Sequence, residues 1–361
     1  MTPSTTRVRL YETVRTAHLE RAKALAPATI IYRQRRYDFH DDAAIGMDLL
    51  QASRAGAAVL LFRSRATAIE INEPLMLSAL PATALALAAL AARAALLGRR
   101  ARVVTYAIAN ADPFAAPVHG VRPKLRRVVD LLLARAVAKR VDRIAFGTPA
   151  AAAIYRTRLP QPQRSTYALI PALPAPRALQ GRKRPESVVF LGAFAERKGI
   201  DLLLQAWPTV VAARPGASLT VLGKGRLEPM VRSAAERLPG MSVRIDPPRD
   251  EILRVLDRTE VLVLPSQPAP RWREQVGLPV VEGLASGCRI VTTTETGLAS
   301  WLAEHGHSVI DRAGDVDALA ASLLEQLASI RSPADVQDDL PSRDGRLAAD
   351  DWLFDGSGPV R

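Results

Sequence analysis

The stretch of residues 261–294 has the pattern of a buried strand, a loop, a helix and a second buried strand. The first strand is the apolar, β-branched run VLVLP, and the second is CRIVTTT. Between them Pro279 stands in the first turn of the predicted helix, and Gly287 follows its end. Two buried strands joined through a helix run parallel, so this stretch predicts an open α/β sheet. Such sheets bind ligands at the carboxyl ends of their strands.

Two carboxylates, Glu274 in the loop and Glu282 in the helix, are separated by seven residues. A carboxylate within an apolar helical segment needs a partner, and backbone amides at a helix N-terminus bind anions. These residues therefore indicate a site for a ligand that carries phosphates and hydroxyls. The alternative is that both acids are solvated or paired with Arg271 and Arg273.

Three motifs resemble those of retaining glycosyltransferases of family four, the glycosyl transferases group 1. The sequence EQVGLPVVE, followed by GLASGCRIV, resembles the E-x7-E donor-site signature of that family. Residues 188–207 resemble the strand, loop and helix that open its C-terminal domain, with Lys198 and Gly199 in the loop, and residues 311–327 resemble its Asp-rich loop and the following helix. The resemblance covers roughly residues 188–327 and is weak before Leu169.

The resemblance implies the GT-B fold, an α/β architecture of two Rossmann-like domains whose parallel sheets face a central cleft. Residues 1–176 are then an acceptor domain, residues 187–335 a nucleotide-sugar donor domain, and residues 336–361 a C-terminal tail. The Pro- and Arg-rich residues 171–186 are the predicted linker and hinge.

The resemblance also implies roles for single residues. Glu282 would accept hydrogen bonds from the ribose hydroxyls, Glu274 would face the donor sugar, and the cations of Lys198 and Arg197 would neutralise the departing diphosphate. The expected catalytic residues are Glu274, Lys198 and Arg197. The expected donor-binding residues are Glu282, Gln275, Val276, Gly277, Leu278, Gly192, Gly223 and Lys224.

Three positions depart from the family pattern. Many members have an Arg where this chain has Ala193, which leaves two alternatives: Arg197 substitutes for that Arg, or phosphate binding is weaker. Where a His near the sugar is expected, the sequence offers Asn110 and Asp112. A solvated basic loop is the alternative for Arg197 and Lys198, and a plain tight turn for the glycines that flank Lys224.

The expected function is a retaining, metal-independent glycosyltransferase that moves a sugar from a nucleotide-sugar donor to an acceptor glycan or lipid, with no cofactor. The alternative is a non-catalytic GT-B-like protein that binds a nucleotide or scaffolds a partner. Asp315 and Asp317 match a D-x-D string, but they precede an apolar helix, where Asp caps are routine. With 5% aromatic residues and no recognised module, the sequence indicates no nucleic-acid partner.

The first half predicts a less regular α/β domain. Strands are expected at residues 28–33, 57–64, 66–73, 102–108, 142–148 and 167–173, and helices at residues 75–97, 123–140 and 149–157. Residues 75–97 approach the composition of a transmembrane span, but Pro81 and the Ala content favour a buried crossover helix.

Residues 122–143 hold eight basic and two acidic residues around an apolar stripe that includes Leu125, Val129, Leu132 and Val137. Two interpretations stay open: a sheet-covering helix with a solvated face, or a basic amphipathic helix on an anionic membrane. The net charge of +13 favours anionic partners. A lone Cys288 and the absence of a signal-peptide core in the first residues predict a cytoplasmic location, including the inner face of the membrane.

Overall fold

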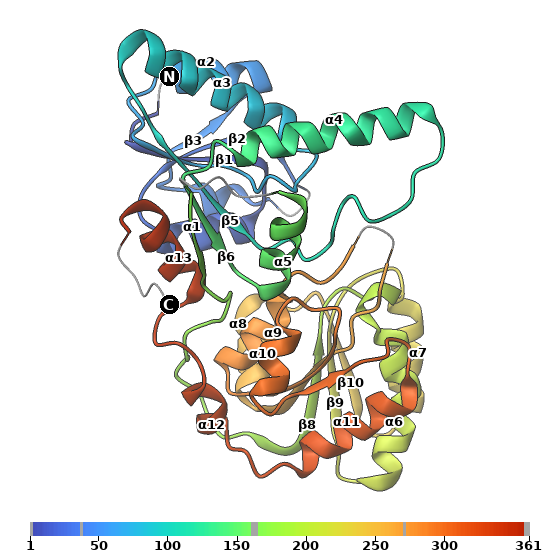
Figure 1. Ribbon diagram of the computed structural model, residues 1–361. Helices are drawn as coiled ribbons and strands as arrows, with labels where there is room; N and C mark the ends of the chain where they lie inside the picture. Colours follow the sequence, from blue (N-terminus) through green and yellow to red (C-terminus); the bar gives the residue numbers. More distant parts are fainter. Residues whose placement is uncertain (1–2, 37–38, 160–164, 270–271, 357–361) are drawn as a thin grey trace. The chain divides into compact units, whose positions relative to one another are not determined.

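The structure is a computed structural model that describes residues 3–36, 39–159, 165–269 and 272–356 (Figure 1). It divides into two compact units, which are treated separately below. Unit 1 contains Met1–Pro171 and Arg346–Arg361, and unit 2 contains Ala172–Gly345.

Unit 1 is built on a parallel sheet with the strand order β3-β2-β1-β4-β5-β6-β7. The chain starts in the middle of this sheet, winds to one edge and then returns to build the other side, as in doubly wound folds. The strands are β1 (Arg7–Val14), β2 (Thr29–Arg35), β3 (Leu49–Gln51), β4 (Ala68–Glu70), β5 (Arg102–Ala107), β6 (Arg143–Phe146) and β7 (Thr166–Leu169). The helices are α1 (Thr16–Ala24), α2 (Arg54–Arg63), α3 (Leu80–Leu97), α4 (Val121–Ala138), α5 (Pro149–Arg158) and α13 (Gly345–Phe354), with the 3-10 turn η1 (Asp41–Ala44).

Helices cover both faces of the unit 1 sheet. One core cluster joins β1, β2, β4, β5 and β6 to α2, α3, α4 and α5. The other face packs against α13 through Trp352, Leu353 and Phe354, and against α1 through Leu19 and Ala22. The three-layer arrangement confirms the expected α/β class.

Two expectations for unit 1 are wrong. Residues 57–64 form most of helix α2, not a strand; a short apolar run does not distinguish the two, and Ser53 caps this helix by accepting a hydrogen bond from the Gly56 amide at 3.1 Å. The central strand β1 was not anticipated. This strand contains Arg9, which is only 1% exposed and is ion-paired with Glu70. A buried charged residue interrupts the apolar pattern that is typical of a central strand.

Helix α3 is the one helix, among the residues that the structure describes, that is long and apolar enough to cross a membrane by length and composition. It also packs as part of unit 1, with Leu80, Leu87 and Leu90 buried in the core. The guanidinium of Arg93 is fully buried and donates hydrogen bonds to the carbonyl oxygens of Ser64 at 3.0 Å and Ala66 at 2.8 Å. These contacts favour the interpretation of α3 as a packed crossover helix.

Unit 2 has a parallel sheet with the strand order β10-β9-β8-β11-β12-β13. Its strands are β8 (Arg184–Leu191), β9 (Ser218–Gly223), β10 (Met241–Ile245), β11 (Thr259–Leu264), β12 (Arg289–Thr293) and β13 (Ser308–Ile310). Its helices are α6 (Ile200–Ala213), α7 (Glu228–Arg237), α8 (Arg249–Asp257), α9 (Leu278–Ala285), α10 (Ala299–Glu304), α11 (Val316–Ala328) and α12 (Pro333–Asp338), with the 3-10 turn η2 (Glu196–Lys198). Strands β11 and β12 with helix α9 are the unit predicted from residues 261–294.

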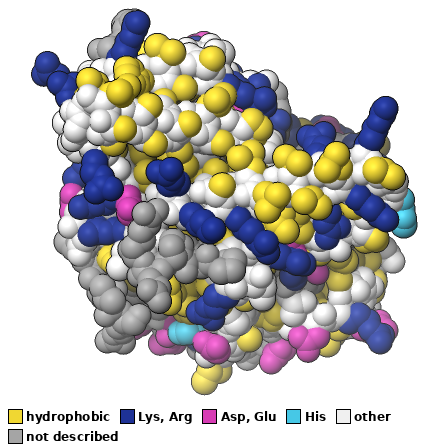
Figure 2. Space-filling view, turned by 45° about the horizontal axis from the view of Figure 1, so that its top comes forward, with side chains coloured by type: hydrophobic (Ala, Val, Ile, Leu, Met, Phe, Trp, Pro, Cys, Tyr) yellow, Lys and Arg dark blue, Asp and Glu magenta, His cyan; other side chains and the backbone are white. Residues whose placement is uncertain are grey.

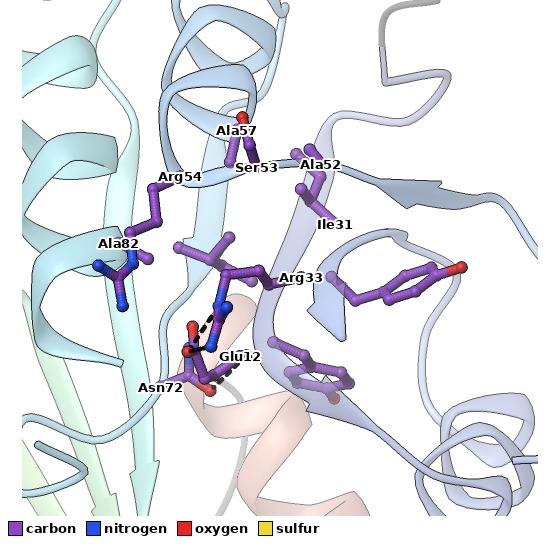
Figure 3. A pocket seen from close by; sticks show the side chains of 12 residues that line it. Glu12, Ile31, Arg33, Ala52, Ser53, Arg54, Ala57, Asn72 and Ala82 are labelled. Atoms are coloured by element: carbon purple, nitrogen blue, oxygen red, sulfur yellow. Dashed lines mark hydrogen bonds and ion pairs between the residues drawn. The ribbon is translucent and has the colours of Figure 1, made fainter. Parts of the chain in front are cut away.

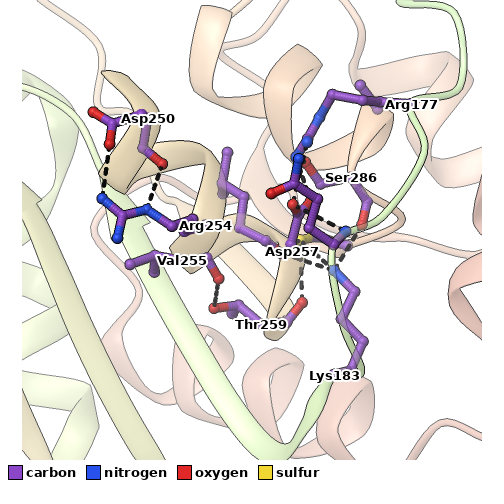
Figure 4. Close-up of polar contacts among 12 residues, drawn as sticks. Arg177, Lys183, Asp250, Arg254, Val255, Asp257, Thr259 and Ser286 are labelled. Atoms are coloured by element: carbon purple, nitrogen blue, oxygen red, sulfur yellow. Dashed lines mark hydrogen bonds and ion pairs between the residues drawn. The ribbon is translucent and has the colours of Figure 1, made fainter. Parts of the chain in front are cut away.

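The boundary between the units lies after Pro171, at the start of the predicted linker, residues 171–186, and the rest of this segment belongs to unit 2. Arg177 forms an ion pair with Asp257 and donates to Ser286 Oγ at 2.8 Å (Figure 4). The ammonium of Lys183 donates to the carbonyl oxygens of Leu256 and Ser286 at 2.8 and 2.7 Å. Composition alone suggested a linker, but these charged side chains bind the segment to unit 2.

The predicted tail, residues 336–361, is divided between the units. Helix α12 and the residues up to Gly345 stay with unit 2, whereas the chain from Arg346 onward belongs to unit 1. The amide of Gly345 donates to the carbonyl of Leu173 at 2.8 Å, so the two ends of unit 2 lie side by side. Two chain crossings therefore connect the units.

Candidate functional site

The candidate site lies at the carboxyl edge of the unit 2 sheet. Strands β8 and β11 are neighbours there, while β9, which follows β8 in the chain, lies on the other side of β8. The loops after β8 and β11 thus leave the sheet in opposite directions. This is the switch point at which open α/β sheets bind ligands.

An ion pair crosses this switch point. The ammonium of Lys198, in the loop after β8, contacts the carboxylate of Glu274, in the loop after β11. Both side chains are largely buried, at 11% and 12% exposure. Two residues that the sequence singled out separately are thus brought together, 76 positions apart in the chain.

Gly199 lets the two loops meet. It has φ 69°, and a Cβ at this position would come within 2.0 Å of the carbonyl oxygen of Pro265 at the end of β11. Any other residue would force the loops apart. Glycine is therefore needed at position 199 to hold Lys198 in its position beside Glu274.

The environment of Glu274 is polar and aromatic. Ser266 Oγ donates to its carboxylate at 3.2 Å, and the Gly297 amide donates to its carbonyl oxygen at 3.1 Å. The ring of Trp272 lies 5.2 Å from Lys198 Nζ and 4.5 Å from Arg197 Cζ. Arg197 thus stacks on the site's aromatic ring.

Glu282 lies apart from this pair. It projects from α9 and accepts a hydrogen bond from Arg249 of α8 at 2.7 Å. Gly277, with φ 79°, is the N-cap residue of α9. Leu278, the first residue of the helix, is 55% exposed.

Each acid is therefore paired with a cation from another segment of the chain, Glu274 with Lys198 and Glu282 with Arg249. Arg273 pairs with Glu295 at 2.9 Å, and Arg271 lies outside the described residues. Between the two acids, Gln275 is exposed and Val276 is partly buried, with its carbonyl accepting from Thr296 Oγ1 at 3.1 Å.

The glycine turn after β9 packs directly on the loop after β8. A Cβ at Gly223 would lie 1.9 Å from the carbonyl oxygen of Gly192, so position 223 needs glycine for this close packing. Lys224 follows this turn and forms an ion pair with Asp246 at 2.7 Å, in which both side chains are more than half exposed. Lys224 is thus at the solvent edge of the site.

Unit 1 contains polar groups at the carboxyl ends of its strands that the sequence interpretation missed. Glu12 lies near the end of β1, two residues before Val14. It is 2% exposed and accepts a hydrogen bond from Arg33 Nε at 2.7 Å in a small pocket (Figure 3). The Glu12 amide donates to Asn72 Oδ1 at 3.2 Å. Glu12 Oε2 and Asn72 Nδ2 have no hydrogen-bond partner among the described residues. If the sequence analysis had identified β1 as a strand, it would have placed Glu12 near the carboxyl end of that strand.

Glu73 lies beside the end of β4. Its carboxylate accepts hydrogen bonds from the Ala109 amide at 3.1 Å and from the Tyr155 hydroxyl at 3.4 Å. Burial outweighs these bonds and raises the pKa of Glu73 to about 7. Asp112, one of the two polar residues expected near a sugar, is instead paired with Arg158 at 2.7 Å.

The D-x-D string caps a helix, as predicted. Asp315 Oδ1 accepts a hydrogen bond from the Ala318 amide at 2.9 Å at the start of α11. Within the described ranges, no group of three or more His, Cys, Asp or Glu side chains could hold a metal ion.

Comparisons with known proteins match the part of the chain that contains this site. Residues 185–329 match the family described as Glycosyl transferases group 1. A glycogen synthase of Halorhodospira halophila is 34% identical over 149 residues, which are 38% of this chain and 30% of that protein. A GDP-mannose-dependent monoacylated alpha-(1-6)-phosphatidylinositol monomannoside mannosyltransferase of Corynebacterium glutamicum is 29% identical over 135 residues, which are 36% of this chain and 35% of that protein. The chain thus spans about a third of the length of these curated relatives.

Solved structures resemble the chain over nearly its whole length. WaaG, a glycosyltransferase involved in lipopolysaccharide biosynthesis, has a TM-score of 0.59 at 14% identity, with 97% of this chain and 100% of WaaG covered. Anabaena Alr3699/HepE in complex with UDP has a TM-score of 0.63 at 12% identity, with 98% and 96% covered. At 12% and 14% sequence identity, the similarity to these structures shows a shared fold and nothing more. Residues 185–329 thus match the glycosyl transferases group 1 family, and the chain has the GT-B fold.

Proposed function

We propose that this chain is a glycosyltransferase that moves a sugar from a nucleotide-sugar donor to an acceptor hydroxyl with retention of configuration and without a metal ion. The observation that carries the proposal is the Lys198–Glu274 pair at the switch point between β8 and β11. In addition, the family match covers this part of the chain.

In the proposed reaction, the bond between the anomeric carbon and the β-phosphate oxygen breaks, and a bond to the acceptor oxygen forms on the same face of the sugar. The acceptor's proton passes to the departing diphosphate. Lys198 would neutralise the negative charge that develops on that diphosphate, and Glu274 would stabilise the positive charge on the sugar. Arg197 would hold the ring of Trp272 against the site through the contact described above.

Glu282 would bind the ribose. Its partner Arg249 is 59% exposed, so the ion pair competes with water and can be exchanged for ribose hydroxyls at little cost. The amides of Gln275, Val276, Gly277 and Leu278 at the start of α9 would meet the diphosphate. Lys224, at the solvent edge, would contact the nucleotide after its exposed partner Asp246 is released.

On the acceptor side we infer a role for the pocket at the end of β1. Glu12 Oε2 accepts and Asn72 Nδ2 donates, and a sugar hydroxyl can satisfy both atoms at once. The acceptor itself would be a glycan or the sugar of a glycolipid.

The test is a donor screen with the full chain. Labelled UDP-, GDP- and ADP-sugars are incubated with the protein, and both donor hydrolysis and transfer to glycan or lipid acceptors are measured. We expect turnover with one donor base, loss of at least about a hundredfold for Lys198→Met, and no loss for the exposed Lys23→Met control. Glu12→Gln should reduce transfer but leave hydrolysis intact. No turnover with any donor, or full activity of Lys198→Met, would refute the proposal.

A further inference from the structure

Helix α4 carries large apolar side chains that the fold does not cover. Residues 121–130, the first ten of this helix, include no buried residue. The exposed large apolar side chains are Val121 at 82%, Leu125 at 63%, Val128 at 53%, Val129 at 52% and Leu132 at 58%. A soluble surface helix normally turns such residues toward the core.

These side chains form one stripe. At about 100° per residue, positions 121, 125, 128, 129 and 132 fall within about 100° of the helix circumference. The helix is anchored by a different side, through Ala134, Val137 and Ala138, which are buried in the unit 1 core. Val137, which the sequence interpretation placed in the stripe, belongs to this buried side. The sheet-covering interpretation therefore holds for the last turns of α4 but not for residues 121–132, whose large apolar side chains named above are exposed.

Positive charge borders the stripe. Arg122 and Lys124 lie on its two sides, at about 70° and about 90° from its centre, and both are exposed. The one acidic residue of the helix, Asp130, lies on the opposite side, where its carboxylate is 3.8 Å from Arg126. The exposed face thus combines an apolar centre with a cationic border.

The neighbouring helices extend this surface. Helix α3 packs against α4 and against α2, and its exposed large apolar side chains are Leu85, Leu96 and Leu97. Figure 2 shows hydrophobic side chains over these helices, with Lys and Arg side chains around and between them. We refer to this area as the α3–α4 surface.

We propose that α4 lies flat on an anionic lipid bilayer, with its apolar stripe among the acyl chains and Arg122 and Lys124 at the level of the lipid phosphates. Basic amphipathic helices bind membranes in this way. Each basic residue near an anionic surface strengthens binding by about fivefold. Charge favours a bilayer over a second copy of this chain, because packing two stripes together would bring their cationic borders into contact.

This inference does not depend on the proposed enzymatic function. The α3–α4 surface contains no residue assigned to the donor or acceptor site, and vesicle binding can be measured without any sugar donor. A failed vesicle test would leave the glycosyltransferase proposal standing, and an inactive enzyme could still bind vesicles.

The experiment is co-sedimentation of the full chain with phosphatidylcholine vesicles, with and without phosphatidylglycerol, at low salt. We expect binding to the anionic vesicles that is at least about tenfold stronger than to the neutral ones and is weakened by added salt. Leu125→Ser with Leu132→Ser should weaken binding by about tenfold or more. Arg122→Glu with Lys124→Glu should weaken it by about 25-fold or more, since two cations are lost.

Matched controls separate the α3–α4 surface from the overall charge. Arg182→Glu with Arg237→Glu makes the same change in net charge on exposed residues of unit 2, and Ile330→Ser removes an apolar side chain that is 101% exposed there. Both controls should bind as the wild type does. Thermal unfolding should be unchanged in the α4 variants, because the replaced side chains are exposed.

Three results would overturn the proposal. The first is no binding to anionic vesicles at low salt, and the second is equal loss of binding in the controls and the α4 variants. The third is a dimer in sedimentation analysis that Leu125→Ser with Leu132→Ser dissociates while vesicles are ignored. That last result would assign the stripe to self-association.

Discussion

Glu274 and Glu282 belong to one sequence motif but have different partners in the folded chain. Glu274 pairs with a lysine that is largely buried, and Glu282 pairs with an arginine that is more than half exposed. A largely buried pair resists separation more strongly than an exposed one. We therefore expect the two acids to act at different stages of the proposed reaction.

Replacing each acid by glutamine should separate these stages. Glu282→Gln should raise the donor KM by about 10- to 100-fold with a smaller change in kcat, because charge-assisted hydrogen bonds to the ribose act equally in the ground and transition states. Glu274→Gln should mainly lower kcat, by about a hundredfold or more, and leave nucleoside diphosphate affinity nearly unchanged. Steady-state kinetics and calorimetric binding measure both effects.

Two outcomes contradict this division of roles. Full activity in both variants would remove both residues from the donor site. Equal loss of nucleotide affinity in both would show that the acids act together.

Glu73 and His307 should give the two units opposite pH dependence. Burial raises the pKa of Glu73 in unit 1 to about 7, from 4.5, so the folded state binds more protons and stability falls as pH rises between about 4.5 and 7. Burial also lowers the pKa of His307 in unit 2 to about 3, from 6.5, and its Nδ1 accepts a hydrogen bond from the Ile290 amide at 3.1 Å. There the unfolded state binds more protons, so stability is lost as pH falls from about 6.5 toward 3.

Denaturation across pH with Glu73→Gln as the variant tests the first half of this prediction. The unit 1 transition of the wild type should lose stability from pH 5 to 8 relative to that of Glu73→Gln. A difference between the two proteins that stays constant over this range would contradict the prediction.

The sequence predicts the members of the site better than their contacts. The spacing around Glu274 and the Lys198–Gly199 pair suffice to identify both loops. The ion pair between them depends on the close approach of Gly199 to Pro265, a tertiary contact that spacing does not reveal. Glu12 was missed because the strand that contains it, β1, was not predicted.

Among the elements, α13 stands out because buried charges hold it to unit 1. Arg9 of β1 and Arg346 of α13 both contact Glu70 of β4 and Asp350 of α13. All four residues are at most 9% exposed. Breaking a buried ion pair leaves an uncompensated charge, so each member is needed by the others.

Asp350→Ala should therefore destabilise unit 1 by about 3–5 kcal/mol. Asp355→Ala is the matched control, because Asp355 follows the same helix and pairs with Arg7 at 2.5 Å while 49% exposed. Exposed ion pairs contribute at most about 1 kcal/mol. Urea denaturation of the two variants measures the difference, and equal effects would show that α13 is held by its apolar face alone.

Elements with strong periodicity were predicted well, and short apolar runs were not. The helices and strands of residues 188–294 follow the expected order because each buried strand alternates with an amphipathic helix. Residues 57–64 were misassigned because a run of six apolar residues, 57–62, fits either a strand or a helix. For α4, the sequence predicted the helix and its stripe but could not show what covers the stripe, which depends on where the helix leaves the sheet.

For the whole molecule, two compact units with separate cores predict two unfolding transitions. If the proposed donor site binds a nucleoside diphosphate, that ligand should shift only the transition of unit 2, by about 2.7 kcal/mol at 100 times its dissociation constant. A thermal-shift screen of UDP, GDP and ADP would identify both the base and the unit. A shift of the unit 1 transition alone would contradict the placement of the donor site.

The two chain crossings between the units determine the order in which the units can be completed during synthesis. Every residue of unit 2 leaves the ribosome before Arg346, whereas unit 1 lacks residues 346–354 of α13 until later. Until α13 emerges, the anionic partner Asp350 of Arg9 is missing, and the face of the sheet that receives Trp352 is open to water. We therefore expect the second half of the chain to become protease-resistant on the ribosome before the first half does. A nascent chain stalled before Arg346 would therefore have a folded unit 2 and an incompletely folded unit 1.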